Sequence, residues 1–533
     1  MKMQAFFSFL PLAGLLLLSL VSSSDDSRRD FVQCLARFSS NSTSMSDVIY
    51  TAKNSSYKSI LNFSINNLRF AKPWTPKPSI IVTPIDESQV QTVVHCSRKY
   101  GMQIRIRCGG HDYEGLSYVS NVPFVMLDMI NYRSIDVDVA NATAWVQSGA
   151  TLGELYYAIA NKSKTLAFPG GVWSTVGVSG LIGGGGYGLL RRKYGLAADN
   201  VIDARIVNAD GRILDRKSMG EDLFWAIRGG VASSFGVVMS WHIRLVVVPE
   251  IVTVFQVSRI LEQNATQLVH KWQTVAPKLP KDLEIRIVAN KFDKFKPAQV
   301  ARTVLAESTV QIRFLSSFLG RMDQLLELMN ERFPELGVQK EDCAEVSYIQ
   351  AVLVFSLFSQ NDPVENLLNR TSYKISFKAK SEYAKQPISV QGLNGIWDML
   401  LKAETGKTNL ILTSYGGQMD EIPESCIPFP HRAGTLYKIY MRIETDGNMP
   451  MALKWIRSLY DYLGPFVSPR TSYVNYNDLD LGMNNPNGPT DYAQASAWGK
   501  KYFKNNFDRL IRVKAVVDPS NFFRHEQSIP IIA

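Results

Sequence analysis

The chain has 533 residues, of which 46% are hydrophobic and 20% are charged, a composition typical of a folded globular protein rather than a disordered one. This length predicts two or three domains. The formal net charge is +10, but the basic residues are scattered, and the densest cluster is only Arg191, Arg192 and Lys193. The composition therefore argues against nucleic acid as a partner and favours a basic surface suited to a cell-wall polyanion.

Residues 1–24 have the pattern of a secretory signal peptide. Lys2 precedes a mostly apolar stretch over 6–21, and small serine residues follow it. The stretch is short and is broken by Pro11 and Gly14, and no later stretch reaches the length of about 18 apolar residues that a membrane span requires. We expect a secreted protein of the extracellular space or cell wall, with no membrane anchor and with the vacuole as an alternative location.

Asparagine and cysteine usage agrees with export. Seven Asn-X-Ser/Thr triplets are candidate N-glycosylation sites, and they are headed by Asn41, Asn54, Asn62, Asn141, Asn161, Asn264 and Asn369. The five cysteines leave at least one unpaired. Cys34 and Cys96 lie on apolar-periodic segments that are typical of helices, and we expect them to form a disulfide, although their spacing alone does not establish the pair.

The first half of the chain alternates between predicted strands and helices. In chain order these are a strand near 79–83, a helix over 85–101, strands over 102–107, 123–129 and 142–149, and a helix that starts near 151. The helix over 85–101 places Val90, Val93 and Val94 on one face. Thr151 and Glu154 form a capping-box pattern, which marks a helix start. The irregular, glycine-rich region that follows is too long to be a simple linker.

The pattern changes at about Glu250. Strands of alternating apolar and polar residues are predicted over 251–260, 283–290 and 309–318, and an amphipathic helix over 321–333. We therefore expect an antiparallel sheet with helices on one face, as a separate α+β unit. The tail that follows combines the segment 473–482, a helix over 493–510 and the segment 516–530.

The glycine-rich region contains a G-x-G-x-x-G pattern. Gly183, Gly185 and Gly188 satisfy it, and Asp203 lies twenty residues after the first of them, which invites a dinucleotide-binding interpretation. The context argues against it, because the following segment supplies only one or two helical turns before another glycine. The glycines still predict one property of this region: they let backbone N–H groups approach an anion closely, as binding of a pyrophosphate requires.

His111 is one of only six histidines, and it follows two glycines at the end of a predicted strand. Cys108 and His111 have the spacing of zinc ligands, but no second Cys/His pair has usable spacing, so we expect no metal. A silent core histidine is the plain alternative. The two preceding glycines instead predict that the backbone here passes close to a ligand.

Four separated motifs, in order, carry a resemblance to a known family. They are "RIRCGGHDYEGLSY", "FPGGVWSTVGVSGLIGGGGYGLLRRKYGLAADNVIDA", "GEDLFWAIRGG" with "SFGVV", and "YVNYNDLDLG" with "DPSNFFRHEQSIP". Together they closely resemble the plant berberine bridge enzyme-like flavoproteins, which include cannabinoid acid synthases and monolignol oxidoreductases. The match runs from about Phe31 to the C-terminus.

The resemblance implies an α+β fold of the FAD-linked oxidase (PCMH) type. The FAD-binding domain is formed from both chain ends, and a substrate domain of antiparallel sheet plus helices is inserted between them. The implied divisions are a signal peptide over 1–24, an FAD-binding domain over 25–250 with its core at about 76–250, a substrate-binding domain over 251–465 and a C-terminal segment over 466–533 that completes the FAD domain.

The resemblance also implies FAD bonded covalently through His111 to the flavin 8α carbon. Relatives commonly have a second link from a cysteine, but Trp173 stands at that position here, so we expect a singly linked flavin with a lower reduction potential. Cys108 lies on the histidine loop and does not count as the missing linker. The other residues that the resemblance implies for the cofactor site are Arg105, Arg107, Cys108, Gly109, Gly110, Asp112, Gly177, Val178, Gly184, Gly185, Tyr187 and Asn475.

For catalysis, the resemblance assigns Tyr476 as the base that takes a substrate proton. Tyr187 and Lys438 match residues that polarise the substrate oxygen and lower the pKa of the tyrosine, which needs a nearby cation because a phenol ordinarily titrates near about 10. The alternative is that Tyr476 and Tyr187 are packed aromatics among 22 tyrosines. Tyr440 replaces a glutamine or glutamate of relatives and argues against an alkaloid ring closure.

Val176 matches the position at which valine admits oxygen to the flavin and leucine or isoleucine blocks it. We therefore expect a secreted FAD-dependent oxidase rather than a dehydrogenase. It would take two electrons from a plant alcohol, a phenolic or specialised metabolite or an oligosaccharide, and pass them to O2 to give H2O2.

Two rival functions stay open. One is a flavin-containing cycloaddition catalyst without net redox, which Arg442 and the altered flavin loop permit. The other is a catalytically impaired secreted glycoprotein, of which Trp173 and Leu181 are the signs.

Overall fold

The computed structural model describes residues 29–37, 45–294, 308–404, 406–445 and 447–532. The expected signal peptide and the triplet at Asn41 lie outside these ranges. Each of the other six asparagines in the predicted glycosylation triplets is exposed. Cys34, on a helix over 29–37, and Cys96, on α3 (Glu87–Lys99), form the expected disulfide with a Cα–Cα distance of 5.9 Å. Every helix in the described part of the chain is too short or too polar to cross a bilayer.

Two sheets make up the N-terminal half. The four-stranded sheet has the order β1-β2-β4-β3, in which β2, β4 and β3 are parallel and β1 is antiparallel. Its strands are β1 (Ile49–Thr51), β2 (Ile80–Val82), β3 (Gln103–Arg107) and β4 (Phe124–Asp128). The predicted helix between β2 and β3 is α3, which begins after the N-cap Asp86 and buries the valine face of the helix.

The second sheet is antiparallel, with the order β5-β6-β10-β8-β9. Its strands are β5 (Ile135–Asp138), β6 (Thr143–Gln147), β8 (Val201–Val207), β9 (Ile213–Leu214) and β10 (Val237–Arg244). The helices of this half are α4 (Leu152–Lys162), α5 (Val178–Gly183), α6 (Arg191–Tyr194) and α7 (Arg216–Ile227). The predicted capping box is present at the start of α4, where Thr151 and Glu154 bond reciprocally. The G-x-G-x-x-G glycines open only the four-residue α6, so they form no dinucleotide-binding helix.

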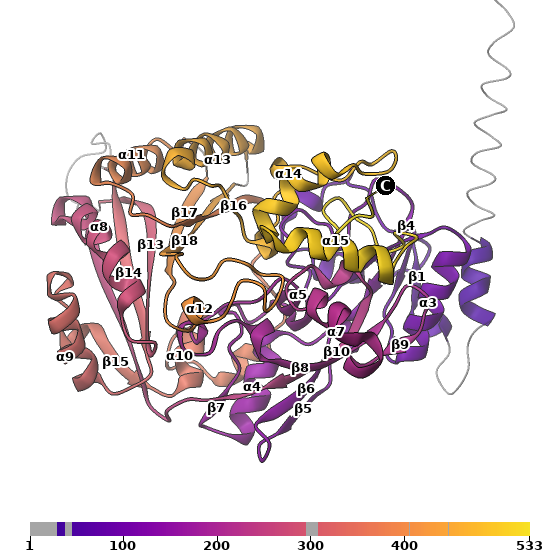
Figure 1. Cartoon of the computed structure of the whole chain (residues 1–533), viewed down its shortest axis with the longest axis horizontal. Coiled ribbons are helices and arrows are strands. Elements are labelled where there is room, and N and C mark those ends of the chain that lie inside the picture. The colour runs from indigo at the N-terminus through magenta and orange to yellow at the C-terminus, as the bar shows by residue number, and fades with distance from the viewer. Residues whose placement is uncertain (1–28, 38–44, 295–307, 405, 446, 533) are drawn as a thin grey trace, which may run out of the picture.

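A seven-stranded antiparallel sheet forms the other half, in the order β15-β12-β14-β13-β17-β18-β16. Its strands are β12 (Val252–Ile260), β13 (Leu283–Asp293), β14 (Ser308–Phe318), β15 (Cys343–Val346), β16 (Phe377–Ala384), β17 (Lys407–Ser414) and β18 (Tyr437–Glu444). Helices cover one face: α8 (Ala265–Val275), α9 (Met322–Arg332), α11 (Val390–Leu401) and α13 (Met449–Leu463) (Figure 1). The three strands and the helix predicted here are all present, and the last of the covering helices, α13, ends at Leu463.

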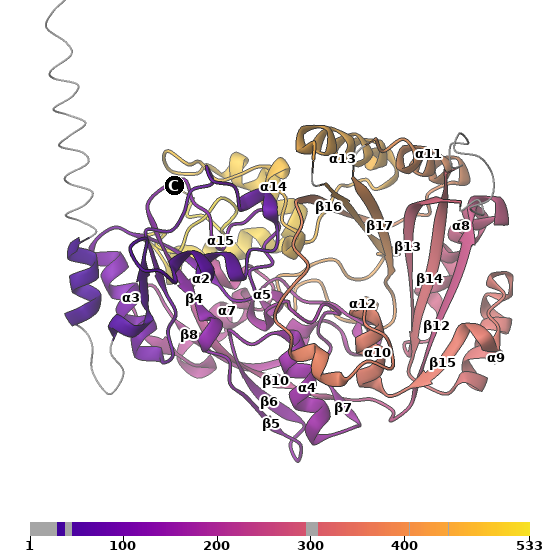
Figure 2. The ribbon, with the colours of Figure 1, turned by 180° about the vertical axis from the view of Figure 1, so that it is seen from behind.

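The C-terminal segment returns to the N-terminal half. Both views show α14 (Tyr492–Phe503) and α15 (Asn506–Val517) against that half rather than beside α11 (Figures 1 and 2). Lys514 on α15 is buried and donates to the carbonyl oxygen of Ser234 at 2.6 Å. The single helix predicted over 493–510 is wrong in one respect: Lys504, at φ 47°, divides it into two helices.

Candidate functional site

The loop that carries His111 lies against a second loop at very close range. A Cβ on Gly109 would fall 2.3 Å from the nitrogen of Gly177, and a Cβ on Gly177 would fall 2.6 Å from the nitrogen of Gly109. On its other side, Asn66 donates to the carbonyl oxygens of Gly109 (3.3 Å) and Gly110 (3.0 Å). Gly110 has φ +69°, which favours glycine. Only glycine backbones fit this approach.

His111 is held by the second loop. Its Nε2 lies 2.8 Å from the Oγ1 of Thr175, the third residue of a turn closed by the N–H of Val176 on the carbonyl of Trp173 at 3.2 Å. Burial, with a smaller contribution from Arg442, lowers the pKa of His111 to about 4. The imidazole is therefore neutral at physiological pH, the form in which a ring nitrogen can act as a nucleophile.

The backbone of the His111 loop suits an anionic group. Within the described ranges, no protein acceptor bonds the N–H groups of Gly109, Gly110 and His111. Consecutive N–H groups without acceptors form a concavity that binds phosphate oxygens. The residues present therefore fit the pyrophosphate of FAD, with the neutral His111 beside it.

Five tyrosines from both halves of the molecule meet in one cluster, here called the tyrosine cluster: Tyr113, Tyr187, Tyr440, Tyr473 and Tyr476. The hydroxyls of Tyr187 and Tyr476 are hydrogen-bonded to each other. Tyr113 stacks on Tyr476 with ring centroids 5.1 Å apart and planes inclined by 6°. Since Tyr113 is two residues from His111, the histidine loop contacts the predicted base directly.

Lys438 projects from β18 into the tyrosine cluster. Its side chain is fully buried, and its Nζ lies 3.2 Å from the ring centroid of Tyr187 and 4.4 Å from that of Tyr476. Among the described residues, no acceptor bonds this Nζ. A buried amino group without a partner is costly, so the position suits a substrate oxygen.

The pKa values of this cluster differ from the expectation. Burial raises the pKa of Tyr476 well above its ordinary value and also raises that of Tyr187. Burial, together with Arg191, lowers the pKa of Lys438 well below its ordinary value. The expected lowering of the tyrosine pKa is therefore not seen among the described residues: burial and then the neighbouring tyrosines raise the pKa of Tyr476.

Asn475 links the glycine-rich region to the predicted base, Tyr476. Its Nδ2 donates to the carbonyl oxygen of Leu181 and to the hydroxyl of Tyr473, each at 2.9 Å. The same hydroxyl accepts the N–H of Gly186 at 2.9 Å. These bonds fix the segment that contains Tyr476.

The charged residues predicted at the cofactor make protein contacts. Arg107 is fully buried and donates to the carbonyl oxygens of Ile60 (2.7 Å) and Leu61 (2.6 Å) and to Asp128 (2.6 Å). Arg105 donates to Leu116 O (3.3 Å) and to Glu526 (3.0 Å). These side chains fix β3 and its loop.

Asp112 and Cys108 also shape the loop. Asp112 accepts the N–H groups of Glu114 (3.0 Å) and Leu116 (2.9 Å), and the side chain of Asn477 donates to both its oxygens at 3.2 Å. It thereby ties the His111 loop to the residue after Tyr476. Burial, with a contribution from Asp128, raises the pKa of Cys108 to about 12, so its thiol is protonated and unsuited to form a flavin bond.

Other predicted residues lie on α5 and around it. Val178 begins α5 and is fully buried, and its N–H donates to Ala150 O at 2.9 Å. Gly185 has φ +113°, and Val176 is half-buried at the end of the Trp173 turn.

Sequence reasoning missed Tyr113, Tyr473 and Thr175. All three lie inside the quoted motifs, two residues or fewer from predicted site residues. The available signal was the concentration of tyrosines next to His111 and Tyr476, but their convergence depends on long-range packing.

A buried ionic cluster joins three chain segments next to the site. Lys378 on β16 is bonded to Glu114 and donates to Asp478 at 2.6 Å, and Lys380 donates to the other oxygen of Asp478 at 2.6 Å. Burial alone would lower the pKa of Lys378, but Glu114 and Asp478 raise it above its ordinary value. The cluster fixes the spacing between the His111 loop, the large sheet and the Tyr476 segment.

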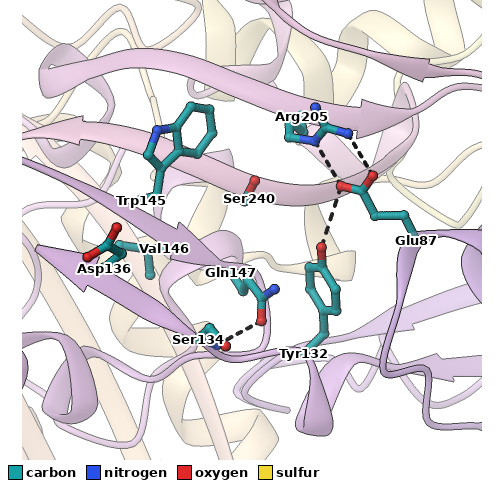
Figure 3. A pocket seen from close by; sticks show the side chains of 9 residues that line it. All are labelled: Glu87, Tyr132, Ser134, Asp136, Trp145, Val146, Gln147, Arg205 and Ser240. Carbon is teal, nitrogen blue, oxygen red and sulfur yellow. Dashed lines mark hydrogen bonds and ion pairs between the residues drawn. The ribbon is translucent and has the colours of Figure 1, made fainter.

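A cavity of about 320 Å³ lies elsewhere, over the five-stranded sheet (Figure 3). It is lined by Glu87, Tyr132, Ser134, Asp136, Trp145, Val146, Gln147, Arg205 and Ser240. Its main charged groups are already paired, since Arg205 bonds both oxygens of Glu87 at 2.8 and 2.7 Å. None of the predicted site residues lines it, and no cluster of potential metal ligands occurs in the described part of the chain. The His111 region is therefore the better candidate site.

Comparison with known proteins identifies the family of this chain. The family described as "FAD binding domain" matches residues 78–216, and that described as "Berberine and berberine like" matches residues 472–530. A tetrahydroberberine oxidase of Berberis wilsoniae is 51% identical, with 99% of each chain covered. The solved structure of berberine bridge enzyme-like 28 of Arabidopsis thaliana is 46% identical and has a TM-score of 0.87, covering 95% of this chain and 100% of its own.

Structures of the grass pollen allergen Phl p 4 are also similar. The wild type, described as a glucose dehydrogenase, and an isoleucine-to-valine variant, described as a glucose oxidase, are each 42% identical. Each has a TM-score of 0.87 and covers 95% of this chain and 100% of its own. The chain belongs to the berberine bridge enzyme-like family of FAD-dependent oxidoreductases.

Proposed function

We propose that this protein is a secreted FAD-dependent oxidase that removes two electrons from a small alcohol, phenolic or sugar-type substrate and passes them to O2, giving H2O2. The observation that carries the proposal is the meeting of Tyr187, Tyr476 and buried Lys438 beside the loop that holds His111. It brings together a candidate proton acceptor, a buried amino group with no acceptor in the described part of the chain, and an anion-binding backbone.

His111 is the proposed point of covalent attachment, through a ring nitrogen. Its neutral state and its bond to Thr175 support the assignment, because the bond orients the imidazole. The N–H groups of Gly109 and Gly110 would hold the pyrophosphate. When bound, FAD supplies the two-electron acceptor for a substrate hydride.

The proposed work of the chain itself is proton transfer and positioning. In its ionised form Tyr476 would take the proton of the substrate hydroxyl, and Tyr187 would stabilise that phenolate by donating the hydrogen bond between the two hydroxyls. Lys438 would bind the substrate oxygen, because its Nζ has no acceptor within the described part of the chain. A bound oxygen with developing negative charge would also favour the charged state of this lysine.

Oxygen as the acceptor is supported by Val176. In Phl p 4, an isoleucine-to-valine variant is described as a glucose oxidase and the wild type as a glucose dehydrogenase. This chain already has a valine, Val176, at the position proposed to control the access of O2 to the flavin. Secretion is supported by the pattern of residues 1–24, the disulfide and the six exposed asparagines of the triplets.

Anaerobic reduction of the purified holoenzyme tests the proposal. A panel of alcohols, phenolics and oligosaccharides should contain a compound that bleaches the visible flavin absorbance, and air should restore the absorbance with formation of H2O2. Product formation without bleaching would favour a cycloaddition instead. No bleaching and no product with any member would favour a protein without activity.

A further inference from the structure

We infer that the substrate carries a carboxylate, which Arg286 and Arg313 bind. This inference rests on the proposed function, because it names the class of substrate for the same site. It starts from the face of the seven-stranded sheet that is not covered by α8, α9, α11 and α13.

The register of the sheet places five basic residues on this face, one of which, Lys407 opposite Glu444 at the start of β17, is exposed. Arg286 on β13 is opposite Thr413 on β17, which is opposite Lys438 on β18. Alternate residues of a strand share a face, so Arg286 lies on the side of Lys438, two strands or about 10 Å away. Arg313 on β14 is opposite Val288 and therefore shares this face with Arg286. The fifth is Arg442, two residues beyond Tyr440 on β18.

The acidic residues of the same face are already paired. Both oxygens of Glu284 accept from Arg191, at 2.7 and 2.8 Å, and Glu444 is paired with Arg442 at 2.9 Å. Among the described residues, neither Arg286 nor Arg313 forms an ion pair. Arg313 bonds only the neutral Asn290, at 3.4 Å. The face therefore carries two guanidinium groups that are not paired with a carboxylate in the described part of the chain.

Arg286 lies with its guanidinium against an aromatic ring and is only partly exposed. Its guanidinium lies 4.5 Å from the ring centroid of Phe355, and its Nε is buried with no acceptor in the described part of the chain. Burial lowers the pKa of both arginines, and the phenols of Tyr187 and Tyr476 are near enough to act on that of Arg286. A desolvated guanidinium without an anion is unfavourable, and a carboxylate is the planar partner that matches its two-pronged geometry.

This arrangement also defines what the site disfavours. A protonated amine would approach Arg286 and Arg313 with no free carboxylate among the described residues of this face. Like charges in a site of low polarity repel strongly. The substrate class is therefore an alcohol or phenol that carries a carboxylate, rather than an amine.

Three probes that share one carbon skeleton and differ in charge test the inference. They are 4-(hydroxymethyl)benzoate, 4-(hydroxymethyl)benzamide and 4-(hydroxymethyl)benzylamine, whose net charges at neutral pH are negative, zero and positive. Binding to the anaerobic holoenzyme is measured by the perturbation of the flavin spectrum. The carboxylate should bind at least about 10-fold more tightly than the amide, as charge-assisted bonds to arginine predict, and the amine should bind weakest.

Arg286→Met and Arg313→Met should each reduce the preference for carboxylate over amide at least about threefold, and together they should abolish it. Arg259→Met is the matched control. Arg259 lies on β12 opposite Ile312, on the helix-covered face of the same sheet, and should leave the preference unchanged. Flavin content and melting temperature report folding, and Arg286→Lys, which retains the charge, should keep part of the preference if Arg286→Met does not fold.

A carboxylate that binds no more tightly than the amide, including no binding of either, would overturn the inference. So would a preference that survives the double substitution. Flavin bleaching by a neutral substrate without any preference for carboxylate would leave the oxidase proposal intact. Carboxylate preference without bleaching by any compound would contradict the oxidase proposal and leave the anion site standing.

Discussion

A methyl group on Gly184 would lie 2.1 Å from the Oδ1 of Asn475, so the two residues fit together only because residue 184 has no side chain. Asn475 is the immediate neighbour of Tyr476 in the chain and bonds the carbonyl oxygen of Leu181 and the hydroxyl of Tyr473. The glycine-rich region and the C-terminal segment therefore pack against each other with complementary shapes.

The first prediction is that Gly184→Ala displaces Asn475 and with it Tyr476. The purified variant should contain less flavin and should be reduced by substrate at least about 10-fold more slowly, because small misplacements of catalytic groups have large effects. Gly180→Ala is the control, since a Cβ there would meet nothing within 4 Å. Equal behaviour of the two variants would contradict the prediction.

The second prediction concerns flavin attachment. After acid denaturation the yellow colour should remain with the protein and map to a peptide that contains His111, whereas His111→Ala should release its flavin to the supernatant. His242→Ala, at a ring stacked on Trp145 over the five-stranded sheet, should retain it. Free FAD released from the wild type would refute the covalent link.

The third prediction concerns the base. Tyr476→Phe removes one hydroxyl and leaves the stacking on Tyr113, so folding and flavin content should persist while anaerobic flavin reduction slows by about 100-fold or more. Tyr187→Phe removes the hydrogen-bonded partner alone and should slow reduction less. A larger loss in Tyr187→Phe would reassign the base to Tyr187.

Much of the fold could be predicted from periodicity. The strands around Phe255, Ile285 and Phe314 alternate because one face of their sheet is packed by helices, and that local pattern is visible in the sequence. The break at Lys504 was not visible, because lysine gives no local signal for a positive φ, and a single helix was predicted.

Residues of the site could be predicted from the sequence only where they lie in a recognisable motif. His111 and Tyr476 lie in quoted motifs, but the stacking of Tyr113 on Tyr476 depends on how two segments far apart in the chain pack together. Lys378 lies in no motif at all. Its partners Glu114 and Asp478 are 264 and 100 residues away, and only the folded structure brings them together.

The fourth prediction is that Lys378→Met destabilises the protein strongly. Removing this cation leaves the carboxylates of Glu114 and Asp478 buried with less compensation, and breaking a buried pair in this way costs about 3–5 kcal/mol. The melting temperature of the holoenzyme should fall by several degrees. Lys193→Met is the control, because it breaks a partly exposed pair with Asp282. It should change the melting temperature little, since exposed ion pairs contribute about 1 kcal/mol or less to the free energy of unfolding.

The last prediction concerns oxygen and rests on Val176. This side chain is half-buried at the end of the turn that begins at Trp173, and the same turn presents Thr175 to His111. Trp173 therefore leaves the turn closed, and the residue after Thr175 stays next to the histidine loop. A longer side chain at this position would add a methylene beside the proposed path of O2.

Val176→Leu should slow reoxidation of the reduced enzyme by O2 at least about 10-fold while leaving anaerobic reduction by substrate nearly unchanged. An artificial electron acceptor should restore turnover, because its electrons need not travel through the same opening. Stopped-flow reoxidation of both proteins measures this directly. In Phl p 4, an isoleucine-to-valine variant is described as a glucose oxidase and the wild type as a glucose dehydrogenase, a change in the opposite direction. Slow reoxidation of the wild type, or no effect of the leucine, would make this protein a dehydrogenase with another acceptor.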